Sequence, residues 1–245
     1  MLQRLLRHSL RGEPMSEDES GKSLDRLIAF SDGVFAFAMT LLVVNLTVPT
    51  LTGSLDKVNE ELWNHLADQG LELFSYALSF WVIGRYWLIH HRMFRVVRRA
   101  DGVLMTLNLL LLMFIALLPW PTEMLGRYGD TTAAVVAYSV VMACMGTASA
   151  ILGWYIIHAG LIDERVTERY QRAARARSFM IPVAFILGIP VAFVDPAAGT
   201  YTWWIAIVVM SVLVHRRYGD VRDPYGGAGR AEATPSAGGD ATASS

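Results

Sequence analysis

The chain has 245 residues, of which 53% are hydrophobic and only 18% charged, and its mean hydropathy is positive. This composition excludes a disordered protein and disfavours an ordinary soluble domain, in which about 25% of residues are charged. The net charge is −1, so bulk charge gives no indication of nucleic-acid binding and none is expected. The single cysteine, Cys144, excludes an intrachain disulfide and lies in an apolar stretch, where it is expected to pack as an inert side chain.

Six apolar segments, separated by polar breaks, predict an all-α polytopic membrane protein with six transmembrane helices. They cover residues 27–48, 70–91, 103–118, 132–158, 177–194 and 198–214. The last two are short, and Pro182, Gly188 and Pro190 interrupt the fifth, so a re-entrant hairpin is the alternative for this pair.

The predicted domain organisation is one membrane domain with flexible ends. Residues 23–218 form the membrane domain, 1–22 a flexible cytoplasmic segment in which Met1 and Met15 are alternative starts, and 219–245 a disordered cytoplasmic tail. The tail is rich in Gly, Ala, Ser and Thr and has nothing to bury.

The distribution of lysine and arginine predicts the orientation in the membrane. Of 21 such residues, only Lys57 and Arg127 fall in loops on one side, and Arg85 falls inside a segment. All the others lie at the chain ends or in the opposite loops. Because cytoplasmic loops are enriched in basic residues, both termini are predicted to be cytoplasmic in a multi-pass protein of the plasma membrane.

The first segment, from Arg26 to Pro49, reads RLIAFSDGVFAFAMTLLVVNLTVP and carries the acid Asp32 inside the span. A carboxylate within a membrane helix is costly unless paired, so Asp32 is a candidate functional residue or a structural polar contact between helices. The sequence alone leaves both readings open.

This segment resembles the signature helix of the endosomal and lysosomal potassium channel family called transmembrane protein 175, in its prokaryotic form. The resemblance covers roughly the first half of the chain. It rests on Arg26, Phe30-Ser31-Asp32, Thr40-Leu41-Leu42, Ser79-Phe80, Tyr86-Trp87, His90-His91, Asn108 and a turn at Pro119–Thr122.

Helical periodicity separates two faces on the first segment. At about 100° per residue, Phe37, Leu41 and Val44 lie on one apolar line, with Thr40 beside them and Arg26 extending the line toward the cytoplasm. Asp32 lies on the opposite face. We therefore expect Asp32 to hold the first helix in place rather than to contact ions.

Depth along the helices predicts the partners of Asp32. A helix rises about 1.5 Å per residue. Counted from the cytoplasmic ends of the first three segments, one layer therefore contains Asp32, Arg85 with Tyr86, and Asn108. In such a layer a buried acid and base neutralise one another. Arg85 is the expected partner, with Asn108 or a histidine as alternatives. The structural polar network is predicted to contain Arg26, Ser31, Asp32, Arg85, Trp87, His90, His91 and Asn108.

The resemblance implies the function of the apolar face. In the family, homotetramers line a pore with the first helices and narrow it with rings of aliphatic side chains, so Phe37, Leu41 and Val44 are implied as constrictions and Thr40 as a selectivity residue. The family has Ile or Leu where this chain has Phe37. The implied function is a potassium-permeable, cation-selective leak channel, with potassium as permeant ion, lipids as surroundings and no cofactor.

Other classes fit the residues less well. A secondary transporter or proton carrier could use Asp32 and Arg85 as a relay, but no second half repeats the Asp32 segment. No enzyme is expected, since the segments carry no nucleophile–base motif. No metal site is expected either, because the adjacent His90 and His91 point about 100° apart and no cysteine ligand set accompanies them.

Overall fold

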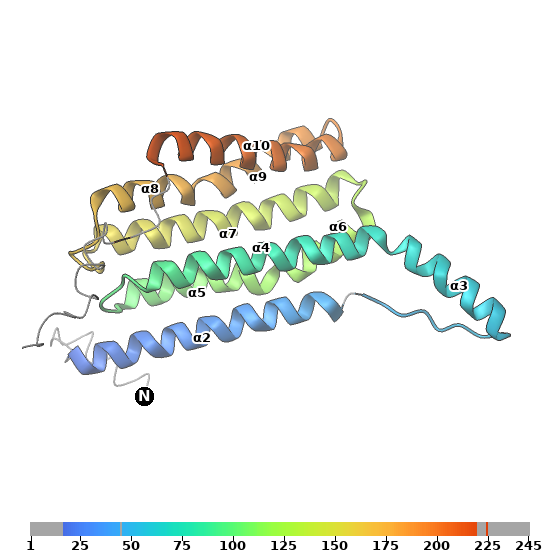
Figure 1. Cartoon of the computed structure of the whole chain (residues 1–245), viewed down its shortest axis with the longest axis horizontal. Helices are drawn as coiled ribbons and strands as arrows, with labels where there is room; N and C mark the ends of the chain where they lie inside the picture. The colour runs from blue at the N-terminus through green and yellow to red at the C-terminus, as the bar shows by residue number, and fades with distance from the viewer. Residues whose placement is uncertain (1–16, 45, 220–223, 225–245) are drawn as a thin grey trace, which may run out of the picture.

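The computed structural model describes residues 17–44, 46–219 and 224, and these form a bundle of long helices that run side by side (Figure 1). The helices are α2 (Glu17–Val44), α3 (Leu55–Asp68), α4 (Gly70–Phe94), α5 (Gly102–Leu117), α6 (Pro119–Tyr128), α7 (Thr132–His158), α8 (Glu168–Ser178), α9 (Met180–Ala192) and α10 (Pro196–Tyr218). Regular structure in these ranges is helical, apart from an isolated bridge between Val97 and Ile162. The predicted all-α class is confirmed.

Five helical stretches within the described residues are long and apolar enough to cross a membrane. They are Gly21–Val44, Gly102–Tyr128, Thr132–His158, Glu168–Ala192 and Pro196–Tyr218. Helix α4 has 25 residues, but Glu72, Arg85 and Arg92 lower its hydropathy. The fourth stretch joins α8 to α9 and is 25 residues long, which favours a full span over the re-entrant hairpin. A sixth crossing by α4 stays a prediction.

Several predicted boundaries differ from the observed ones. Helix α2 begins at Glu17, so residues 17–22 belong to it and not to a flexible segment, and it ends at Val44 instead of residue 48. The expected turn at Pro119–Thr122 is the first turn of α6. Proline is well accommodated there because the first amide groups of a helix have no intrahelical acceptor. The predicted tail lies outside the described residues except for 219 and 224.

The spacing of buried residues explains how α2 lies in the bundle. Leu24, Ser31, Phe35, Ala38 and Leu42 are buried on one face, at intervals of three, four or seven residues that correspond to whole helical turns. This face packs against α4, α5 and α6. The opposite face of α2 is not covered by any other described part of the chain.

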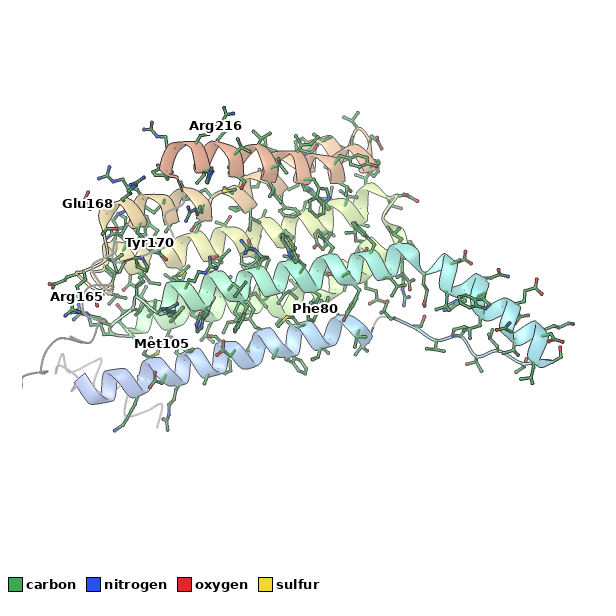
Figure 2. The ribbon with its side chains drawn as sticks, in the orientation of Figure 1. Phe80, Met105, Arg165, Glu168, Tyr170 and Arg216 are labelled. Atoms are coloured by element: carbon green, nitrogen blue, oxygen red, sulfur yellow. The ribbon has the colours of Figure 1, made fainter. Side chains whose placement is uncertain are left out.

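The two ends of the bundle differ in charge and shape. Helix α3 projects from one end (Figure 1) and has no buried residue. At the other end, which we call the basic end, the α4–α5 connection (95–101) meets the α7–α8 connection (159–167), and α2 begins and α10 ends there. Figure 2 shows Arg165, Glu168 and Tyr170 at this end.

The basic end is closed by backbone and ionic contacts. The Arg98 amide donates to the Leu161 carbonyl at 2.9 Å, and the Asp163 amide donates to the Val96 carbonyl at 2.9 Å. The Asp163 carboxylate accepts from the Arg165 amide and from Arg98, at 2.9 and 3.0 Å. These donors, the Arg165 amide first, lower the pKa of Asp163 below its ordinary value.

Helices α9 and α10 approach each other closely through glycines. A Cβ atom at Gly199 would lie 2.8 Å from the Ala192 Cβ and 2.9 Å from its Cα. At Gly188 a Cβ would meet the Trp203 ring, which is buried against Tyr138 and Phe185. Small residues thus set the distance between these two helices, as is common between membrane helices.

We therefore predict that Gly199→Ala lowers the melting temperature of the purified protein. The added methyl group must displace Ala192, and overpacking of this kind costs about 1–3 kcal/mol. Gly21→Ala is the matched control, since a Cβ at Gly21 has nothing within 4 Å. Equal melting temperatures for the two variants would contradict a tight α9–α10 contact at Gly199.

Candidate functional site: the polar network and exposed face of the first helix

Asn108 of α5 links α2 and α4 through hydrogen bonds. Its side chain is fully buried. The amide Nδ2 donates to Ser31 Oγ at 2.9 Å, and Ser31 Oγ donates to the Leu27 carbonyl at 2.8 Å. The amide oxygen accepts from His90 Nε2 at 2.8 Å, which requires the proton on that ring nitrogen. Asn108 therefore donates one hydrogen bond to α2 and accepts one from α4.

Aromatic packing encloses this hydrogen-bonded group. His90 is 2% exposed and stacks on Phe94, with ring centroids 4.3 Å apart. Phe35 of α2 lies against the same imidazole at 5.4 Å. Because water is excluded here, each hydrogen bond is hard to replace, and its loss leaves an unsatisfied polar group.

Asp32 has a different partner from the one predicted. Trp87 Nε1 donates to Asp32 Oδ1 at 2.8 Å, and the indole stacks on His91 at 5.8 Å. Arg85 is exposed on the outer side of α4 and makes no ion pair with any described residue. The predicted Asp32–Arg85 pair is therefore wrong, although Asp32 does connect α2 to α4.

The error has a geometric cause. Arg85, Tyr86 and Trp87 lie at nearly one depth, but successive residues of a helix point about 100° apart. Depth alone therefore does not choose among them. Trp87 faces Asp32, Tyr86 is buried away from it, and Arg85 faces out of the bundle. We call Ser31, Asp32, Trp87, His90 and Asn108 the polar network.

The exposed side of α2 carries the residues predicted to line a pore. Phe37 is 61% exposed and Val44 69%, whereas Leu41 is half-buried at the edge of this face. Thr40 is exposed and lies near the centre of this face, whereas the sequence pattern placed it beside the apolar line of Phe37, Leu41 and Val44. Arg26 lies on the same side, toward the basic end.

The Thr40 hydroxyl donates to the Phe37 carbonyl at 2.8 Å. A hydroxyl oxygen has two lone pairs besides its proton. With the proton directed to the backbone, the lone pairs stay available on the exposed side. Backbone bonding and contact with a cation are thus compatible at Thr40.

A second buried polar cluster was not anticipated as a network. Thr122 Oγ1 lies 2.9 Å from Ser79 Oγ, and Ser79 Oγ lies 3.2 Å from Tyr138 Oη. These hydroxyls join α4, α6 and α7. The available signal was the presence of Ser79 inside an apolar segment and of Thr122 in the predicted turn at Pro119–Thr122. Among the described residues, no three His, Cys, Asp or Glu side chains are grouped to hold a metal ion.

These features define a polytopic α-helical membrane protein whose first helix is fixed on one side by polar contacts and bare on the other. Residues 26–119 match the family model described as endosomal/lysosomal potassium channel TMEM175. The chain is 42% identical over 183 residues to a potassium channel of Streptomyces collinus, covering 73% of this chain and 84% of the relative. The chain belongs to the TMEM175 family of ion channels, which confirms the resemblance and identifies an ion channel rather than an enzyme.

Two further comparisons bear on fold and function. The crystal structure of a lysosomal potassium-selective channel TMEM175 homologue from Chamaesiphon minutus superposes with a TM-score of 0.65 at 26% identity. That match covers 79% of this chain and 98% of the homologue. An endosomal/lysosomal proton channel TMEM175 of Gallus gallus is 30% identical over 148 residues, which cover 59% of this chain and only 30% of that protein.

We predict that Asp32→Ala and Asp32→Asn behave differently. Alanine leaves the Trp87 indole N–H without an acceptor, and loss of a hydrogen bond to a charged group costs about 1.5–3 kcal/mol. Asparagine keeps an acceptor oxygen of the same shape. The melting temperature and yield of assembled protein should fall clearly for alanine and little for asparagine. Equal losses would show instead that the charge of Asp32 is required.

Proposed function

We propose that the protein is a potassium-permeable, cation-selective leak channel of the plasma membrane, with both termini cytoplasmic. Residues 23–218 constitute the channel domain. The names of the Streptomyces and Chamaesiphon relatives support potassium as the permeant ion. The observation that carries the proposal is the division of α2 into a face held by the polar network and an exposed, mainly apolar face.

The exposed face requires several copies to enclose a pore. The exposed face of a single α2 lies on the outside of its protomer and cannot enclose a channel by itself. In the proposed homotetramer, four α2 helices face a central axis and the polar networks lie behind them. The polar network then has a mechanical function: it fixes the rotation of each α2 about its own axis.

The proposed constriction is made by rings of Phe37, Leu41 and Val44. Along the helix these rings are about 6 and 4.5 Å apart, at 1.5 Å per residue. Narrow apolar rings stop conduction by losing their water, so small changes in helix tilt or rotation are enough to switch them. Leu41 lies at the edge of the exposed face, so its approach to the axis depends most on that rotation.

The alternative of a carrier that uses an Asp32–Arg85 relay has lost its main support. Asp32 bonds to Trp87, and Arg85 lies on the outer side of α4. Since the Gallus gallus relative is named a proton channel, proton permeation is the specific competitor to test beside potassium.

The decisive experiment measures purified protein in a planar bilayer under opposing potassium and sodium gradients. The proposal requires discrete current steps and a reversal potential shifted from zero toward the potassium equilibrium potential. A second recording with a pH gradient and symmetric potassium distinguishes proton permeation from potassium permeation, because proton selectivity would shift the reversal potential away from zero. Saturable flux without steps would reject a channel.

We predict that Phe37→Asn increases the potassium current. Replacing a ring of phenylalanines with amides widens the constriction and keeps it wet, which removes the barrier of an apolar gate. Ile205→Ala is a suitable control, since Ile205 is 64% exposed on α10, which does not pack against α2. Unchanged current from correctly assembled Phe37→Asn protein would argue that Phe37 does not face the pore.

A fourth prediction concerns Thr40. Four hydroxyl oxygens at one level replace part of an ion's water shell, and potassium gives up water more readily than sodium. Thr40→Val keeps the side-chain shape and removes the oxygen, so the potassium–sodium reversal potential should move toward zero. Thr40→Ser keeps the oxygen and should preserve it. If valine leaves the reversal potential unaltered in intact tetramers, Thr40 contributes only packing.

A further inference from the structure

A cavity of about 150 Å³ lies between α4, α7, α8 and α9, close to the basic end of the bundle. An apolar cavity of this size in a protein holds about one benzene-sized group. Its lining is apolar toward the bundle, with Ile89, Met93 and Ile157 among the wall residues. Trp154 and Phe179, both about half exposed, flank its opening. The cavity is therefore accessible from the side of the bundle.

The part of the cavity nearest the basic end carries positive charge without acids. Arg92, Arg175 and Arg177 line it, and its lining contains neither Asp nor Glu. The buried Arg175 Nε atom has no hydrogen-bond partner among the described residues. By contrast, Arg172, one turn away on α8, pairs with Glu168 at 2.6 Å. Arg177 donates to the Gly219 carbonyl at 3.3 Å, so the charge available to a ligand is that of Arg92 and Arg175, beside which no acid among the described residues lines the cavity.

Tyr86 bounds the deeper end of the same cavity. Tyr86 lines it and is 3% exposed, and its hydroxyl has no hydrogen-bond partner among the described residues. Along α4, Tyr86 is six residues, or about 9 Å, further into the bundle than Arg92. The hydroxyl lies against Gly146 and Pro182, which do not line the cavity, so Tyr86 closes the deep end of the cavity without offering its hydroxyl to a ligand.

We propose that this cavity binds one acyl chain of an anionic glycerophospholipid whose phosphate lies at the arginines. The lipid phosphate accepts hydrogen bonds from Arg92 and Arg175, and the first carbons of the acyl chain fill the cavity against its apolar wall. The order from arginines to aliphatic side chains matches the order of groups along such a lipid. Basic cavities between transmembrane helices near the cytoplasmic face are suited to anionic headgroups.

Lipid binding to the full-length purified protein tests the proposal by native mass spectrometry. Phosphatidylglycerol should bind more tightly than phosphatidylcholine of the same chain length. Arg92→Gln and Arg175→Gln should each weaken phosphatidylglycerol binding about fivefold, the effect of about 1 kcal/mol per basic residue near a membrane surface. Arg216→Gln is the matched control, since Arg216 is exposed on α10 and does not line the cavity (Figure 2).

A further variant tests the apolar part of the assignment without removing charge. Gly153→Leu places a side chain in the cavity, where a Cβ would meet only the flexible end of Met93 at 3.4 Å, and should reduce binding strongly. Glycerol phosphate, which has the headgroup chemistry without chains, should not compete at the same concentration.

Equal binding of the two lipids, or equal effects of Arg175→Gln and Arg216→Gln, would overturn the proposal. Competition by glycerol phosphate would reassign the site to a soluble phosphate. These measurements do not use ion flux, so their failure would leave the proposed channel function unaffected, and a failure of the channel proposal would leave the lipid site standing.

Discussion

The hydrogen bonds of Asn108 are the contact on which the arrangement of α2 depends. Inside a membrane, helices gain little by burying apolar side chains against one another, because lipid is equally apolar. Directional contacts therefore decide how a helix is rotated. Asn108 donates to Ser31 on α2 and accepts from His90 on α4, which fixes three helices relative to one another. The rotation of α2 in turn decides that Phe37 and Thr40 lie on the uncovered side.

Asp32 and Trp87 extend this control along the helix without adding a buried ion pair. A carboxylate whose neighbour is an indole N–H keeps one strong hydrogen bond, and the half-buried position of Asp32 lessens the cost of its charge. The acid in the signature segment is thus explained by the contact between α2 and α4. From Arg26 to Val44 the exposed face of α2 carries no acid, which is consistent with a pore whose narrow part is apolar.

The sequence predicted much of this arrangement, and the remainder depended on rotation. Apolar segments revealed the helices, and the residues Phe30-Ser31-Asp32 with His90 and Asn108 revealed both the family and most of the polar network. Depth along each span was predicted well because the rise per residue is constant. The rotation of α4 about its own axis was not predicted, because it depends on which of its side chains fits against α2. Trp87, and not Arg85, faces Asp32. Helix ends also escaped prediction, because Pro119 begins a helix as readily as it ends one.

Because Trp87 and not Arg85 is the partner of Asp32, the exposed position of Arg85 requires a separate explanation. An arginine facing lipid within a span is costly, and such residues normally face protein or water. On α4 it lies on the outer side, away from the residues that pack inside the protomer. The uncovered face of α2 and the outward arginine of α4 are therefore two independent features that a single protomer leaves unsatisfied. The proposed tetramer buries the uncovered α2 face against other copies, so the proposed pore and the proposed tetramer are physically one hypothesis. Arg85 points about 160° away from Trp87, the residue that faces α2, and therefore lies on another side of the protomer.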